Sequence, residues 1–286
     1  MNKKTKAILF ILSSAFCFAL MNAFVRLAGD IPSVQKSFFR NLVAFFFALI
    51  VLIRAKEPVR IARHNLPFYL IRSVMGTIGI LCNFYAVDHL LLSDASMLNK
   101  LSPFFSILFS FLFLKERVKP VQALGILAAF GGALLIIKPG FSAAAFPAFI
   151  GMLGGLSAGA AYTAVRYLGQ RGERGPVIVL FFSGFSCLVV SPVLLFDYTP
   201  MSFYQLAMLL CAGLAAAGGQ FSITAAYSNA PAREISVYDY TQVIFAALLG
   251  FLLFQQTPDL WSVLGYVVIC GVSVLMFLYN RRTDAA

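Results

Sequence analysis

Charged residues are scarce in this chain of 286 residues: Asp, Glu, Lys and Arg make up 12% of it, against about 25% in a soluble domain. Hydrophobic residues make up 60%, and the mean hydropathy is +0.88. This composition excludes a soluble fold, because a domain of this length has too little interior to bury so much apolar surface. The chain is expected to lie in a bilayer, where only α-helices and closed β-barrels satisfy the backbone hydrogen bonds.

Motifs for catalysis, metal binding and nucleotide binding are also missing. The only two histidines, His64 and His89, fall in expected loops, and no His-Glu-x-x-His or Gly-x-x-x-x-Gly-Lys-Ser/Thr sequence is present. The five cysteines lie inside apolar runs, and none forms a Cys-x-x-Cys pair. We therefore expect no enzyme activity, no metal site and no cofactor.

The apolar runs are continuous and about 20 residues long, which favours membrane-spanning helices over short alternating strands. The first run resembles the start of a signal peptide. It is long enough to span and lacks a small-residue cleavage site, so it is expected to be retained. The runs predict an all-α, polytopic membrane protein with ten transmembrane helices at residues 7–27, 33–53, 67–87, 92–114, 121–138, 146–168, 176–197, 203–226, 231–254 and 260–279.

The same pattern occurs twice along the chain. Under a constant shift of 140 residues, without a gap, matching residues include Val25-Arg26 with Val165-Arg166, Gly79 with Gly219, Asn99 with Asp239, and Gly131 with Gly271. This predicts two related five-helix units, residues 1–140 and 141–286. Because five is odd, the second unit enters the membrane from the opposite side, and inverted repeats of this kind are typical of secondary transporters.

The Lys and Arg residues in short connections predict the orientation, because cytoplasmic loops retain positive charge. With the N-terminus inside, the inner connections receive fifteen Lys and Arg residues, whereas the outer ones receive two, Lys36 and Lys138. Both termini are expected in the cytoplasm, and the protein in the cytoplasmic membrane as a multi-pass protein. The net charge of +11 is explained by these connections, so nucleic acid is not an expected partner.

Ionisable side chains inside a bilayer are functional candidates unless they reach an interface or form a pair. Those at depth are Arg26, Arg40, Arg72, Lys100, Arg166 and Asp239. Arg26, Arg72 and Arg166 lie near helix ends, where anchoring at the interface explains them. Arg40 lies deeper, and a role at an outer vestibule and a buried ion pair fit it equally well.

Asn99-Lys100 and Asp239-Tyr240 occupy matching places on two predicted helices, about 12 Å from each helix start and hence near the midplane. Inverted repeats hold their substrates at this depth. Asp239 can form a structural ion pair, take up a proton or bind a substrate amine, and the sequence leaves these alternatives open. Further polar side chains on helices one, three, six and eight indicate a cavity by their joint presence, although a hydrogen bond between helices explains any single one.

Small residues gather on two of the predicted helices. One carries Gly151, Gly154-Gly155 and Gly159, and the other carries a run of alanines and glycines at 212–219. We interpret both as faces for close helix packing.

The run Ser-Pro-Phe-Phe-Ser-Ile-Leu-Phe-Ser-Phe-Leu-Phe-Leu-Lys-Glu-Arg at 102–117, followed by Gly125 and Gly131-Gly132, resembles the drug/metabolite transporter superfamily of the EamA type. Its Leu-x-Glu ending matches the usual end of the family's helix four, whereas the second copy has Gln256 where Glu is usual. The segment at 237–245 is similar to bacterial S-adenosylmethionine carriers and solute-carrier 35G proteins. The resemblance implies a central cavity between the units and alternating access, coupled to protons or to a counter-substrate.

The resemblance also implies which residues bind the substrate. By position these are Asn22, Asn83, Asn99, Lys100, Tyr162, Gln220, Tyr227, Asp239 and Gln242. We expect a secondary-active transporter of a small polar metabolite, an amino-acid-like or nucleoside-like zwitterion. The alternatives are a transporter of organic anions, which the excess of cations at depth favours, and a membrane interaction protein without a solute path. Transport direction and the choice between monomer and homodimer stay open.

Overall fold

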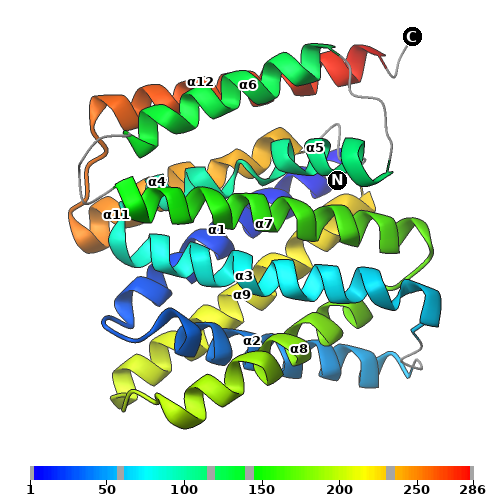
Figure 1. The fold of residues 1–286 in the computed structure, drawn as a ribbon, viewed down its shortest axis with the longest axis vertical. Helices are drawn as coiled ribbons and strands as arrows, with labels where there is room; N and C mark the ends of the chain where they lie inside the picture. Colours follow the sequence, from blue (N-terminus) through cyan, green and yellow to red (C-terminus); the bar gives the residue numbers. More distant parts are fainter. Residues whose placement is uncertain (1–2, 57–60, 115–119, 139–144, 230–235, 284–286) are drawn as a thin grey trace.

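The computed structural model describes residues 3–56, 61–114, 120–138, 145–229 and 236–283, which are almost entirely helical (Figure 1). The α-helices are α1 Lys3–Leu27, α2 Ser33–Arg54, α3 Leu66–His89, α4 Leu92–Asn99, α5 Ser102–Leu114, α6 Pro120–Ile137, α7 Ala145–Gln170, α8 Gly175–Phe196, α9 Phe203–Asn229, α11 Thr241–Phe254 and α12 Leu260–Thr283. Two 3-10 helices, η1 Arg63–Asn65 and η2 Ser236–Tyr240, precede α3 and α11. Within these ranges seven helices are long and apolar enough to cross a membrane. The predicted all-α membrane fold is confirmed.

Two of the predicted helices are not continuous in the structure. The helix expected at 92–114 is interrupted at Lys100-Leu101, so that α4 and α5 share one span. Proline explains the break, because Pro103 lacks an N–H group and its ring collides with the carbonyl four residues earlier. In the second unit the described part of the helix expected at 231–254 begins with η2 and becomes α-helical at Thr241. Residues 231–235 of that prediction lie outside the described residues.

The helices pack in pairs that the 140-residue shift maps onto one another. α1 packs along α9 and α3 packs along α7, and the shift exchanges these two pairs. α2 packs on α8 and α6 on α12, and each of these pairs maps onto itself, at opposite edges of the molecule in Figure 1. α1 and α7 run in opposite directions (Figure 1). The fold is therefore a pair of inverted five-helix repeats, related by a pseudo-two-fold axis.

Glycines on α7 allow the interrupted span to come close. A Cβ atom added at Gly155 would lie 2.5 Å from the carbonyl oxygen of Leu98, and one added at Gly159 would lie 2.8 Å from that of Ser102. On the same helix, a Cβ at Gly154 would lie 3.4 Å from the carbonyl oxygen of Gly79 on α3. The predicted packing role of these glycines is confirmed, and it positions the break between α4 and α5.

We expect Gly155→Ala to lower the free energy of unfolding by about 1–3 kcal/mol, because the added methyl group meets backbone that must shift. Gly131→Ala on α6 is the matched control: no atom lies within 4 Å of its added Cβ, and alanine favours a helix by up to about 1 kcal/mol. The midpoint of thermal unfolding of the protein in detergent should fall for Gly155→Ala and hold or rise for Gly131→Ala. Equal midpoints would contradict the close packing.

Candidate functional site

A cavity of about 170 Å³ lies between the two repeats at mid-depth, with room for on the order of ten water molecules. Its lining reaches Gly175 and Pro176, which begin α8 at the end of the bundle that carries the termini. Eight predicted residues line it: Asn22, Asn83, Asn99, Lys100, Tyr162, Gln220, Asp239 and Gln242. The ninth, Tyr227, belongs to α9, but its side chain lies outside the described part. The lining also includes α2 and α8, which the sequence did not place at the cavity.

The two interrupted spans meet at this cavity. The Lys100 Nζ atom lies 2.5 Å from Asp239 Oδ2, and these side chains are 9% and 18% exposed. The Tyr240 hydroxyl donates to the Lys100 carbonyl over 3.2 Å, which joins the breaks a second time. The other carboxylate oxygen, Asp239 Oδ1, is buried and accepts no hydrogen bond from the described residues. Of the alternatives that the sequence left open for Asp239, the structure shows an ion pair, with Lys100, and leaves Oδ1 without a described donor.

Two asparagines of the lining connect three helices. Asn83 on α3 donates to Asn22 on α1 over 3.2 Å, and Asn22 donates to Ser96 on α4 over 3.4 Å. These bonds match the structural alternative that the sequence allowed for each residue. Asn83 Oδ1 is nevertheless buried without a described hydrogen-bond partner. It can therefore accept a hydrogen bond from a solute in the cavity.

Two arginines were not predicted to bind substrate but line the cavity. The prediction of Arg72 as an interfacial anchor is wrong: its guanidinium group folds back against Gly76 and lies 4.1 Å from the ring centre of Phe182. Arg40 is 9% exposed and donates to Asn41 over 2.6 Å. The signal in the sequence was spacing, because Arg72 and Gly76 are one helical turn apart.

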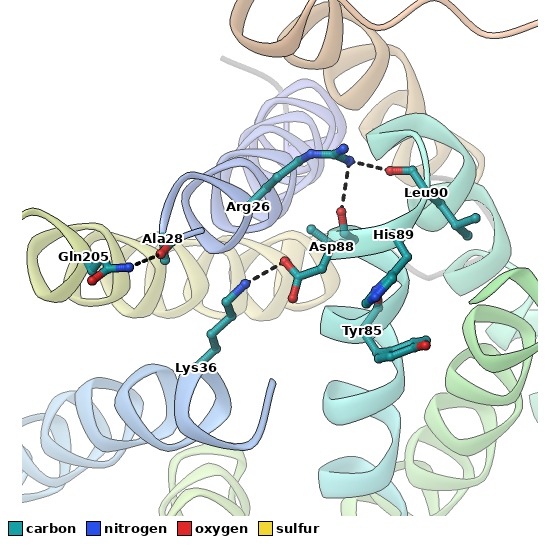
Figure 2. A network of polar contacts seen from close by, with 9 residues as sticks. Arg26, Ala28, Lys36, Tyr85, Asp88, His89, Leu90 and Gln205 are labelled. Carbon is teal, nitrogen blue, oxygen red and sulfur yellow. Dashed lines mark hydrogen bonds and ion pairs between the residues drawn. The ribbon is translucent and has the colours of Figure 1, made fainter. Parts of the chain in front are cut away.

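A polar network links α1, α2 and α3 at the end of the bundle away from the termini (Figure 2). Lys36 on α2 is fully buried, and its Nζ atom lies 2.6 Å from Asp88 Oδ1 near the end of α3. Arg26, at the end of α1, donates to the Val87 carbonyl over 3.0 Å and to the Leu90 carbonyl. Arg26 thus satisfies carbonyl groups at the end of α3 that have no partner within the helix.

This network corrects two predictions. Lys36 was counted among the charges of the outer connections, whereas it is buried in an ion pair. Arg26 was predicted to extend to the interface, whereas it binds carbonyl groups and stacks over Phe254 at 5.2 Å. Its repeat mate Arg166 is exposed. Lys36 lies one turn before Arg40 on α2, and this spacing was the available signal of a shared buried face.

A second ion pair at the same end is exposed. Lys138 and Asp259 lie 2.5 Å apart with side chains 39% and 52% exposed. The hydrogen bond from Lys138 holds the pKa of the Asp259 carboxyl below its usual value. Such an exposed pair contributes little to stability, about 0–1 kcal/mol, which makes it a natural comparison for the buried Lys36–Asp88 pair.

Inverted repeats around a central cavity that charged and polar side chains line define a multi-pass membrane transport protein. The sequence profile of the EamA-like transporter family matches residues 5–138 and 145–278, and the chain belongs to this family. Among the described residues, no group of three or more His, Cys, Asp and Glu could hold a metal ion.

Individual relatives agree with this family. The chain is 35% identical over 269 residues to the pseudopaline exporter CntI of Pseudomonas aeruginosa strain UCBPP-PA14, covering 93% of each chain. It is 26% identical to human solute carrier family 35 member G1, covering 92% of this chain and 76% of that protein. A solved structure titled "Crystal structure of protein" superposes with a TM-score of 0.67 at 14% identity, over 98% of this chain and 99% of the other, and supports the fold alone.

Proposed function

We propose that this chain is a secondary-active transporter that carries a small, amine-bearing zwitterion across the cytoplasmic membrane by alternating access. The observation that carries the proposal is the meeting of the two helix breaks at Lys100 and Asp239. A carboxylate with one unpartnered oxygen at mid-depth is suited to accept a hydrogen bond from a substrate ammonium group. Backbone breaks at such a site are common in transporters, where they line a cavity.

Alternating access is supported by the asymmetry of the two ends. The cavity lining reaches the start of α8 at the end with the termini, whereas Lys36, Asp88 and Arg26 connect the helices at the other end. If the termini are cytoplasmic, as the distribution of Lys and Arg predicts, this form faces the cytoplasm. Inverted repeats can exchange conformations, and that exchange would produce the form open to the other side.

One relative supports outward movement of the solute. The pseudopaline exporter is similar over almost its whole length, and we infer that this chain is also an exporter. Coupling to protons or to a counter-substrate would involve Asp239, the carboxylate at the cavity. Lipid is the surrounding medium, and association into a homodimer stays a prediction from the sequence.

A binding screen followed by transport tests the proposal. Purified protein should unfold at a higher temperature with amino-acid-like compounds than with nucleosides or amine-free carboxylates, because a ligand stabilises the state that it binds, by about 2.7 kcal/mol at 100 times its Kd. Compounds that stabilise should then show counterflow in proteoliposomes. Stabilisation by amine-free compounds alone would refute the substrate class, and a lack of counterflow for every stabilising compound would refute transport.

A further inference from the structure

The charges that line the cavity do not balance. Arg40, Arg72 and Lys100 contribute three positive charges, and Asp239 contributes one negative charge. Asp239 is paired with Lys100, and no carboxylate of the described residues lies within ion-pair distance of either arginine. A buried charge is costly unless something pairs with it. The cavity therefore has two positive charges available to a solute.

Both guanidinium groups are held in place by neighbours that leave part of each free. Arg40 is fixed through Asn41, which in turn donates to Ser186 over 2.8 Å. The Arg72 guanidinium group packs on the ring of Phe182, and it occupies space that is open only because Gly76 has no Cβ atom. The Nε atoms of both arginines are buried without a described hydrogen-bond partner. Such a preorganised donor loses little entropy when it binds an acceptor.

The two arginines also meet the same helix. Arg72 packs on Phe182 of α8, and Arg40 is linked through Asn41 to Ser186, one turn further along α8, while both arginines line the same cavity. Two like charges held together in a buried place repel each other, and an anion between them removes that repulsion. Arginine binds carboxylate and phosphate oxygens through two parallel hydrogen bonds, which gives both strength and geometry.

We propose that Arg40 and Arg72 form an oxyanion site that binds a carboxylate of the transported solute. This rests on the proposed transport function and narrows its substrate class: an amino-acid-like metabolite with an additional acidic group, whose amine lies at Asp239. Two positive charges at one part of the cavity and a carboxylate at another select a solute that is zwitterionic with a net negative charge.

Glutamate and glutamine are the probes, since they differ mainly by one anionic group, and inorganic phosphate tests the other common oxyanion. Titrations of purified protein in lipid nanodiscs should show a larger rise in unfolding temperature with L-glutamate than with L-glutamine, and little with phosphate. Equal shifts with glutamate and glutamine, or no shift with glutamate at millimolar concentration, would overturn the proposal. Stabilisation by phosphate alone would assign the site to phosphorylated solutes and overturn the carboxylate assignment.

Variants localise the effect. Arg72→Gln removes a charge, whereas Gly76→Ala keeps every charge and displaces the Arg72 guanidinium with a methyl group. Each should weaken glutamate binding by about tenfold or more, as expected for losing a charged hydrogen bond, while glutamine binding changes less. Arg171→Gln is the control, because Arg171 lies in an exposed loop against Tyr167 at 4.5 Å. An unchanged preference for glutamate in both cavity variants would overturn the site.

The outcomes separate this inference from the proposed function. If the preference for glutamate is missing but neutral amino acids still show counterflow, the oxyanion site is wrong and the transporter stands. If glutamate binds through both arginines but neither it nor any stabilising compound is moved, the site stands and the transport function is wrong.

Discussion

Asp239→Asn is expected to reduce solute counterflow in proteoliposomes by about 100-fold or more. The substitution removes the partner of a largely buried ammonium group, Lys100. Leaving such a charge unpaired costs about 3–5 kcal/mol, and each 1.4 kcal/mol corresponds to about tenfold. The substitution also removes the negative charge that we assign to binding of the substrate amine. Asn99 is the repeat mate of Asp239 and also lines the cavity, so Asn99→Ala should reduce transport as well. Size-exclusion profiles and unfolding temperatures would show that the variants remain folded.

A double variant separates a functional carboxylate from a structural ion pair. Lys100→Met with Asp239→Asn removes both charges, so that no unpaired ion is left at the junction of α4, α5 and η2. A purely structural pair would allow this neutral variant to transport normally, because buried pairs are often replaceable by uncharged side chains. We expect it to stay inactive. Recovery of transport in the double variant would contradict the role of Asp239 in binding.

Asp88→Asn is expected to open the end of the bundle away from the termini. It leaves Lys36, which is fully buried, without its anion, and so destabilises the form in which this end is closed. Removing one partner of a buried pair costs about 3–5 kcal/mol. Because the Asp88 side chain is 20% exposed, we expect a cost at or below the lower end of this range. A population shift of about tenfold or more toward the open form should follow.

Labelling of a single cysteine measures this shift. Ala158→Cys places the thiol at the cavity lining, in a background from which the five native cysteines have been removed. A membrane-impermeant maleimide applied from the side away from the termini should react about tenfold faster after Asp88→Asn. Asp259→Asn is the matched control, because it breaks the exposed pair with Lys138 at the same end and should change little. Equal rates for the two variants would contradict a gating role of Lys36 and Asp88.

Much of the candidate site could be predicted because polar side chains are rare in an apolar chain. Eight of the nine residues chosen from sequence line one cavity, although their roles in binding stay predictions. The pair of Lys36 and Asp88 could not be predicted, since the two residues come from different helices. Pro103 carried a signal for the break between α4 and α5, but the second unit has Val243 at the matching position, and no proline marks the change from η2 to α11.

The arginines show the same limit. Arg72 lies near a helix end, and from its position the sequence favoured an interfacial anchor. The Arg72 side chain points into the cavity because it packs on the ring of Phe182 in the other repeat and because Gly76 leaves room for it. Long side chains can turn toward an interface or into a cavity, and contacts across helices decide between the two.

The sequence by itself determined the membrane fold, the duplication and the inverted insertion of the repeats. These follow from quantities that are local along the chain: apolar runs of spanning length, charges in connections and a constant shift between the halves. The tertiary structure alone decided that the two breaks meet at Lys100 and Asp239, that Lys36 and Asp88 form a buried ion pair, and that Arg40 and Arg72 share the cavity. Pairing of buried charges depends on distances between helices, and the bilayer makes each such charge costly enough that those distances decide its partner.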